Sequence, residues 1–165
     1  MTGVLYRYLS SDHERLNALL DRAGNSDAID IEVYSEFRKG LLRHISLEEK
    51  IILPAIARWQ GGRRAAIADR LRLDHSAIVS LLVPPPNRSI IRTLQSVFEV
   101  HNPLEEDEGG LYRLFEKLAG SETPKMLKKL QTAPDVLVLS HNEKPELVEL
   151  AKQALARAGF EFKEE

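Results

Sequence analysis

The sequence predicts an all-α fold, an up-down-up-down four-helix bundle with a C-terminal helical appendage. Four long segments carry apolar residues at alternating steps of three and four, which is the spacing of one face of an α-helix. Short polar, glycine-rich or proline-rich stretches connect them, as in an antiparallel bundle. No strand pattern has enough partners for a sheet. We expect the bundle in residues 1–120 and the appendage, packed on it, in residues 121–165.

The first two helices are marked by their ends. The tetrapeptide SDHE at residues 11–14 fits a capping box, in which the serine and glutamate side chains satisfy free amides at a helix start. Gly24 suits a left-handed helix stop. The second helix is expected over about residues 31–58, where Pro54 should kink it or end its regular part because proline has no N–H to donate.

Glycine and proline also delimit the third and fourth helices. The third is expected over about residues 63–83, between a Gly-Gly pair and three consecutive prolines. The fourth is expected over about residues 89–119. Pro103 and the glycines at 109–110 weaken it, so we expect a bend or a partial break there.

Three shorter signals predict the appendage. A short helix should begin at Thr123, and the sequence DVLVLS should be extended. A last helix is expected over about residues 145–157, closed by Gly159. These pieces should cover the bundle rather than form a second domain.

The composition is that of an ordinary globular protein. The 165 residues are 43% hydrophobic and 29% charged, enough for one domain with a continuous core. A net charge of −2 and a pI near 6.2 argue against a nucleic-acid partner or an anionic membrane surface. No apolar run approaches the roughly 20 residues of a membrane span, and the first residues lack a signal-peptide pattern. We therefore expect a cytoplasmic protein that binds neither nucleic acid nor membrane.

A histidine-glutamate motif occurs twice. The pattern H-x-x-x-E-E lies at residues 44–49 and again at residues 101–106. In each, the histidine and the glutamate four residues later point to the same side of a helix, on the apolar face where Leu or Ile is usual. The first and third helices carry one histidine each on the corresponding face. Six polar side chains should therefore meet inside the bundle: His13, His44, Glu48, His75, His101 and Glu105.

These six side chains suit a pair of metal ions. The sequence has no cysteine, and imidazole with carboxylate is a ligand set for iron, manganese or zinc. Each ion would take two histidine nitrogens and share both glutamates and a solvent bridge. One position of an octahedral ion then stays open for dioxygen, nitric oxide or peroxide. Without the ions, we expect the facing glutamates to raise each other's pKa and the bundle to loosen.

Simpler interpretations of the same residues stay open. Histidine-glutamate pairs four apart also decorate helix surfaces, and a lone histidine on an apolar face is more often a hydrogen-bonded core residue than a ligand. Glu49 and Glu106 should lie outside the site, although Glu106 can replace Glu105 if the proline before it rotates the helix face. Asp74 should form a salt bridge or lie at the surface. Tyr112 should pack in the core or donate a hydrogen bond near the site.

Four segments carry a resemblance to a known family. SDHERLNALLDRA, FRKGLLRHISLEEKIILP, RLDHSAIVSLL and HNPLEEDEGGLY, in this order, resemble the haemerythrin-like HHE cation-binding domain family over about residues 8 to 118. The resemblance implies a four-helix bundle around a non-haem di-iron centre, with two iron ions joined by an oxo or hydroxo bridge. Zinc or manganese could occupy the same ligands. Carried over by position, the implied metal ligands are His13, His44, Glu48, His75, His101 and Glu105, with the glutamates bridging.

This ligand set differs from that of the oxygen-carrying members. Those proteins have a fifth histidine on the third helix, whereas the positions one turn either side of His75 are Leu71 and Val79. The set is more similar to the four-His, two-Glu centres of iron-sulfur-repair and iron-sensing relatives. The cysteine-containing segment of the repair proteins has no counterpart in a sequence without cysteine.

Taken together, the residues and the resemblance favour a protein that binds or senses dioxygen, nitric oxide or iron at a di-iron centre. Whether it is an enzyme stays open, with binding preferred. The alternatives are a di-iron oxidase or peroxidase, an iron-sulfur-centre repair protein, and a scaffold whose histidines are simply packed. The oligomeric state is not determined by these patterns.

Overall fold

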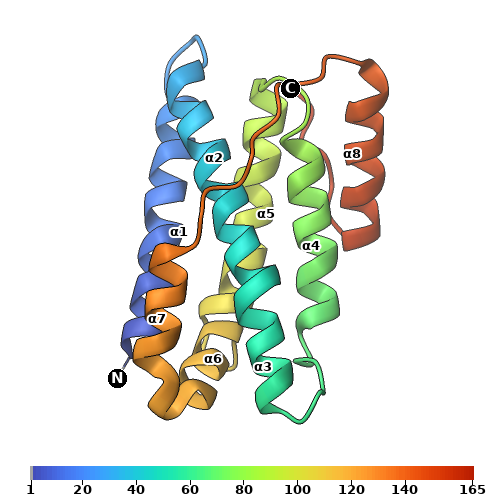
Figure 1. Ribbon diagram of the computed structural model, residues 1–165. Helices are drawn as coiled ribbons and strands as arrows, with labels where there is room; N and C mark the ends of the chain where they lie inside the picture. Colours follow the sequence, from blue (N-terminus) through green and yellow to red (C-terminus); the bar gives the residue numbers. More distant parts are fainter. Residues whose placement is uncertain (1) are drawn as a thin grey trace.

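The computed structural model describes residues 2–165, and in that part of the chain every regular element is helical (Figure 1). In chain order the elements are α1 (Val4–Ala23), α2 (Ile31–Leu47), the π-helical turn η1 (Glu48–Ile52), α3 (Leu53–Trp59), α4 (Ala68–Leu81), α5 (Arg88–Glu106), α6 (Leu111–Ala119), the 3₁₀ turn η2 (Gly120–Glu122), α7 (Thr123–Thr132) and α8 (Pro145–Ala158). The all-α prediction is confirmed. The up-down-up-down order of the four main helices stays a prediction.

The long helices lie side by side. Helix α2 continues through η1 into α3, and α5 is followed by α6, so that each pair runs along the molecule (Figure 1). Helix α1 packs against α2, α5 and α6, while α4 packs against α5. On the outside, α7 contacts α1 and α6, and α8 contacts α4. The division into a bundle and a C-terminal appendage packed on it stays a prediction. Helix α8 contributes Ala151 and Leu155 to an apolar cluster that it shares with the long helices.

The apolar core consists of two clusters, one towards each end of the bundle. On α1, Leu9 belongs to one cluster and Leu16 to the other. On α4, Leu71 and Ile78 are divided in the same way. The segments between these residues contain the predicted histidines, so apolar side chains enclose the polar ones from both ends of the helices. Burial of this kind removes water and strengthens every charge interaction between them.

Helix α1 begins earlier than the sequence indicates. It starts at Val4 after Gly3, and the serine of the expected capping box, Ser11, lies inside the helix. Leu5 and Leu9 are fully buried one and two turns into the helix. Their packing outweighs the local capping signal, so the predicted start at residues 11–14 is wrong.

The second predicted helix contains the expected disturbance at Pro54, in a specific form. Asp30 caps the start of α2 by accepting a hydrogen bond from the Val33 amide at 3.1 Å. A π-helical turn then begins at Glu48, just before Pro54 in the first turn of α3. Such turns insert one extra residue and occur often at functional sites. Here the turn carries one of the predicted metal ligands.

The boundaries of the third and fourth helices are partly as predicted. Helix α4 begins at Ala68, five residues later than expected, and Gly62 before it has a left-handed conformation with φ of 93°. The predicted break near residues 109–110 is confirmed, since α5 ends at Glu106 and α6 starts at Leu111. A Cβ atom at Gly110 would lie 2.6 Å from the Glu105 carbonyl oxygen. Glycine is therefore required for the chain to pass this close to the Glu105 carbonyl between α5 and α6.

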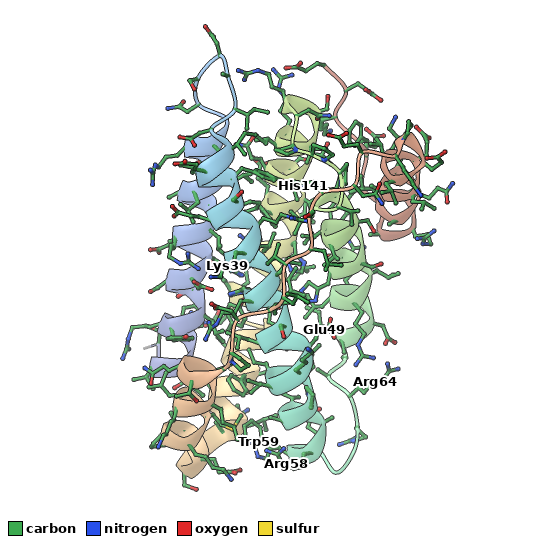
Figure 2. All side chains as sticks on the ribbon, turned by 45° about the horizontal axis from the view of Figure 1, so that its top comes forward. Lys39, Glu49, Arg58, Trp59, Arg64 and His141 are labelled. Atoms are coloured by element: carbon green, nitrogen blue, oxygen red, sulfur yellow. The ribbon has the colours of Figure 1, made fainter. Side chains whose placement is uncertain are left out.

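The C-terminal segment follows its predicted pattern. Helix α7 begins at Thr123, residues 133–144 have no regular structure, and α8 ends with Gly159 at φ of 85°. The Arg38 guanidinium holds this linker by donating to the Leu139 carbonyl at 2.7 Å. At the far end, the Trp59 indole (Figure 2) donates to Glu122 at 2.6 Å. Among the described residues, no helix is both long and apolar enough to span a bilayer.

Candidate metal centre

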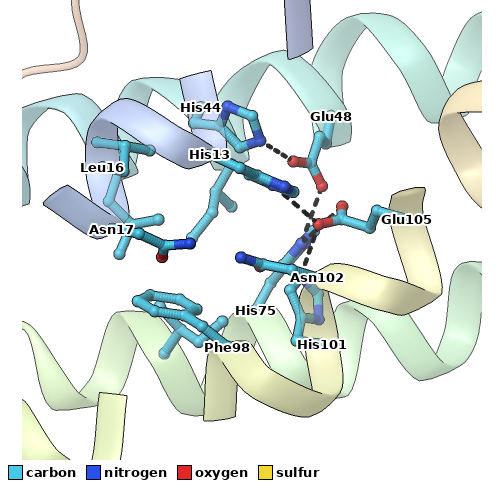
Figure 3. A pocket seen from close by; sticks show the side chains of 13 residues that line it. His13, Leu16, Asn17, His44, Glu48, His75, Phe98, His101, Asn102 and Glu105 are labelled. Carbon is cyan, nitrogen blue, oxygen red and sulfur yellow. Dashed lines mark ion pairs between the residues drawn. The ribbon is translucent and has the colours of Figure 1, made fainter. Parts of the chain in front are cut away.

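The six predicted side chains come together in the middle of the bundle (Figure 3). They reach the centre from five elements: His13 from α1, His44 from α2, Glu48 from η1, His75 from α4, and His101 and Glu105 from α5. Both glutamates are 0% exposed and each histidine is at most 6% exposed. Hydrophobic neighbours therefore seal a group of acidic and basic side chains that would otherwise be hydrated.

The six side chains form two overlapping groups. One consists of His13, His44, Glu48 and Glu105, and the other of Glu48, His75, His101 and Glu105. In each group one ligand atom per residue lies within 4.8 Å of all the others. Both glutamates belong to both groups. Each group has the side chains to hold a metal ion, and both groups use the same two carboxylates.

The two glutamates face both histidine pairs. Glu48 Oε1 lies 2.6 Å from His44 Nε2, and Glu48 Oε2 lies 3.1 Å from His75 Nε2. Glu105 Oε1 lies 3.3 Å from His13 Nε2 and 3.0 Å from His101 Nε2. A carboxylate that approaches both pairs in this way has the geometry of a bridging ligand.

Several of the central atoms lack hydrogen bonds. Glu48 Oε2, both carboxylate oxygens of Glu105 and His75 Nε2 are buried without a hydrogen-bond partner among the described residues. The close approach of His75 to Glu48 does not have the angles of a hydrogen bond. Buried carboxylate oxygens are normally satisfied, and leaving them bare is costly. Cations between these atoms would satisfy all of them, so the donor set fits a metal centre.

The comparison with known families agrees with this geometry. Residues 4–119 match the model of the Hemerythrin HHE cation binding domain. The chain belongs to this family. The resemblance predicted from the four segments is therefore confirmed over most of the bundle. No curated protein and no solved structure matches the chain.

In the HHE domain of this protein, a second carboxylate contacts each central histidine at Nδ1, the ring nitrogen that points away from the centre. In every case the carboxylate lies 2.7–2.9 Å from the histidine Nδ1 atom. The pairs are Asp12 with His44, Glu49 with His75, Asp74 with His101, and Glu106 with His13. An ionised carboxylate only accepts, so each Nδ1 carries the proton. This fixes the orientation of the ring and directs Nε2 towards the centre.

These four carboxylates and their histidines link the helices in a closed ring around the candidate metal centre. Each one comes from the helix next to that of its histidine, in the order α1 to α2, η1 to α4, α4 to α5, and α5 back to α1. Neighbouring helices are thus connected in pairs by a charged hydrogen bond. Each of these hydrogen bonds orients one imidazole so that its Nε2 atom faces the centre.

The structure shows on which side of the histidines each neighbouring carboxylate lies. Glu105 faces the centre, whereas Glu106 holds His13 from outside, as does Glu49 for His75. Asp74 forms the predicted salt bridge, with His101, and does not lie at the surface, because its side chain is 0% exposed. Sequence reasoning also missed Asp12. The sequence pattern that could have revealed it is a carboxylate residue next to a predicted ligand residue in each of the four helical segments, as Asp-His or Glu-Glu.

The histidines attract protons strongly when no cation is present. Burial lowers the pKa of His44, but the charges of Glu48 and Asp12 outweigh it and raise the pKa to about 10. In the same way, carboxylates overcome burial and raise the pKa of His75 to about 10 and that of His101 to about 9. Burial raises the pKa of Glu48, yet the imidazoles hold it well below its usual value. The expected rise in glutamate pKa is therefore wrong for Glu48, because histidines surround it.

These pKa values predict that metal binding releases protons. At pH 7.5, His44, His75 and His101 carry protons, since their pKa values of about 9 to 10 lie above the pH. A metal ion needs the Nε2 lone pairs. We therefore expect about three protons to leave these histidines when the candidate centre binds metal at pH 7.5. Apparent metal affinity should rise with pH until about pH 10. A pH indicator in weak buffer measures the release. Release of no protons would show that the free histidines are already neutral.

Proposed function

We propose that this HHE-domain protein is a non-haem di-iron protein that binds or senses a diatomic ligand, dioxygen or nitric oxide. The observation that carries the proposal is the sharing of two buried glutamates by two histidine pairs. In this proposal His13 and His44 would hold one iron, and His75 and His101 would hold the other. Glu48 and Glu105 would be ligands of both.

The iron pair would supply an open coordination position and electrons for a diatomic ligand. The protein supplies the surroundings. The outer carboxylates keep the imidazoles oriented, and the two apolar clusters keep bulk water away. Four neutral nitrogen donors with two shared carboxylates give fewer anionic ligands than a carboxylate-rich centre. This favours reversible binding or sensing over strongly oxidising chemistry.

A small cavity beside the centre supports a small ligand. Its volume is about 10 Å³, which is room for about one water-sized molecule. Besides the six central residues, the lining is mostly apolar: Leu16, Leu41, Ile45, Ile78 and Phe98. Figure 3 shows Leu16 and Phe98 on this side of the centre, with Asn17 and Asn102 close by. Such a space excludes an organic substrate and agrees with a ligand of only one or two heavy atoms.

A surface cleft leads towards this cavity. The cleft has a volume of about 490 Å³ and shares His13, Asn17, Phe98 and Asn102 with the cavity lining. Its charged lining residues other than histidine are all acidic: Glu14, Asp21, Glu99 and Glu106. Negative charge repels anions and does not hinder neutral gases. The acidic cleft therefore agrees with a neutral diatomic ligand.

Reconstitution with ferrous iron tests the proposal. The protein is loaded under anaerobic conditions and then exposed to air or to nitric oxide. We expect the charge-transfer absorption of a bridged diferric centre after air, or the spectrum of an iron-nitrosyl after nitric oxide. Reaction should be stoichiometric with protein. Absence of both spectra from iron-loaded protein would contradict the proposal, and many turnovers of peroxide with a reductant would indicate an enzyme instead.

Filling the cavity should separate ligand binding from iron binding. Ile78 lines the cavity, and the substitution Ile78→Phe adds volume there without removing a metal-facing atom. We expect iron content to stay unchanged while nitric oxide affinity falls by about tenfold or more. The matched control is Ile90→Phe, which alters an equally buried core isoleucine outside the cavity. Both substitutions should cost about 1–3 kcal/mol of stability by overpacking. Equal nitric oxide affinity in the two variants would show that the cavity is not the binding site.

A further inference from the structure

The hydroxyl of Tyr112 lies inside the candidate metal centre. Tyr112 belongs to the first turn of α6 and is 0% exposed. Its Oη atom is 2.8 Å from His44 Nε2, 2.9 Å from His13 Nε2 and 3.1 Å from Glu48 Oε1. The chain reaches the centre here after the tight turn between α5 and α6, in which the Gly110 amide donates to the Asp107 carbonyl at 2.7 Å.

The hydroxyl is on the metal-facing side of both histidines. Asp12 and Glu106 occupy the Nδ1 atoms of His44 and His13, so the Nε2 atoms that face Tyr112 are the ones available to a cation. Without a cation, one imidazolium N–H can donate to the phenol, which in turn donates to Glu48. With a cation, the Nε2 lone pairs point to the metal, and no N–H group is left to donate to the Tyr112 oxygen.

The three distances match the spacing of ligands around one ion. Adjacent ligand atoms that each lie about 2.1 Å from an octahedral ion are about 3 Å apart. The Tyr112 Oη atom is 2.8–3.1 Å from three atoms of the same candidate group. An ion in contact with His13, His44 and Glu48 is therefore also within bonding reach of the phenol oxygen. Tyrosine oxygen is a known iron ligand in proteins.

We propose that Tyr112 is a further protein ligand, bound as phenolate, to the ion that His13 and His44 hold. The proposal rests on the proposed metal function and makes the two ions inequivalent. The other three tyrosines do not supply a phenol to the second group. Tyr6 and Tyr8 donate to the backbone carbonyls of Glu106 and Leu130, and Tyr34 packs in the core against Phe37.

Ligation by Tyr112 has two consequences. The O–H bond breaks as the metal–oxygen bond forms, and the proton leaves to solvent in addition to the protons released by the histidines. Burial and the nearby carboxylates raise the pKa of Tyr112 well above its usual value, so the phenol loses this proton only when a cation is present. The phenolate also occupies the open position of its own ion. A diatomic ligand would then bind to the ion beside His75 and His101.

Resonance Raman spectroscopy of the diferric protein tests the proposal. Excitation in the visible phenolate-to-iron band should enhance tyrosine ring modes in the wild type. Tyr112→Phe should keep two irons per chain and lose both the band and the modes. The control is Tyr34→Phe, which removes a phenol hydroxyl from an equally buried tyrosine whose oxygen has no hydrogen-bond partner. This control should keep the wild-type spectrum.

The outcomes separate this proposal from the proposed function. Diferric wild type without phenolate modes would overturn the role of Tyr112 and leave the di-iron function intact. Wild type that binds no iron would overturn both. If Tyr112→Phe does not fold, the other tyrosines decide: modes that persist in Tyr6→Phe, Tyr8→Phe and Tyr34→Phe assign the ligand to Tyr112, and their loss in any of these variants contradicts it.

Discussion

Glu48→Gln should lose both metal ions rather than one. The Glu48 oxygens face His44 on one side and His75 on the other, so a single substitution removes the shared anion from both positions. Glutamine keeps the size of the buried side chain, which preserves packing, but its amide cannot bridge two cations as an anion. We expect the affinity for iron to fall more than about 100-fold at both positions, beyond the range for outer residues. Iron content of the purified variant measures this loss.

Glu49→Gln is the matched control for that experiment. It changes the adjacent glutamate by the same chemistry, but Glu49 contacts the outer Nδ1 atom of His75 at 2.8 Å and the Arg72 guanidinium at 3.5 Å, and none of the other central residues. We expect a fall of about 10–100-fold at the His75 position and little change at the other. If Glu48→Gln and Glu49→Gln bind iron equally well, Glu48 does not bridge the ions.

Removal of the metal should lower the melting temperature substantially. An ion that binds the folded centre and not the unfolded chain stabilises the protein by about 4 kcal/mol per site when free metal is at about a thousand times its Kd. For a chain of this size that corresponds to about 8–16 °C. Differential scanning calorimetry with and without a chelator gives the difference.

The charged ring explains why the metal-free protein should still fold. Imidazolium and carboxylate groups pair inside the centre, and the two apolar clusters are independent of the metal. We therefore expect a lower melting temperature with retained helix content, measured by circular dichroism. An unchanged melting temperature in chelator, with iron shown to be absent, would mean that the centre adds nothing to stability. It would favour a scaffold whose histidines are simply packed.

The site could be predicted from the sequence because helix geometry is regular. Residues four apart lie on one face, so His44 with Glu48 and His101 with Glu105 had to point in the same direction. Polar residues on an apolar face must then meet in the core. The structure confirms that the six side chains meet, since their ligand atoms lie within 4.8 Å of one another in two groups. Their role as ligands stays a proposal.

The outer residues could not be predicted in the same way. Asp12 and Asp74 act on histidines of other helices, and which helices are neighbours depends on the bundle and not on local spacing. Tyr112 enters the centre only because α5 ends at Glu106 and α6 begins anew at Leu111, after the turn that contains Gly110. The start of α1 at Val4 depends likewise on packing of Leu5 and Leu9, which outweighs a good local cap.

Stepwise anaerobic addition of ferrous iron to metal-free protein tests the central claim most directly. The claim is that two histidine pairs share Glu48 and Glu105 to hold two cations. A competing chelator dye reports the amount of bound iron. The titration curve should rise linearly and level off at two equivalents of iron per chain. A break at one equivalent, or no binding above that of Glu48→Gln, would contradict it.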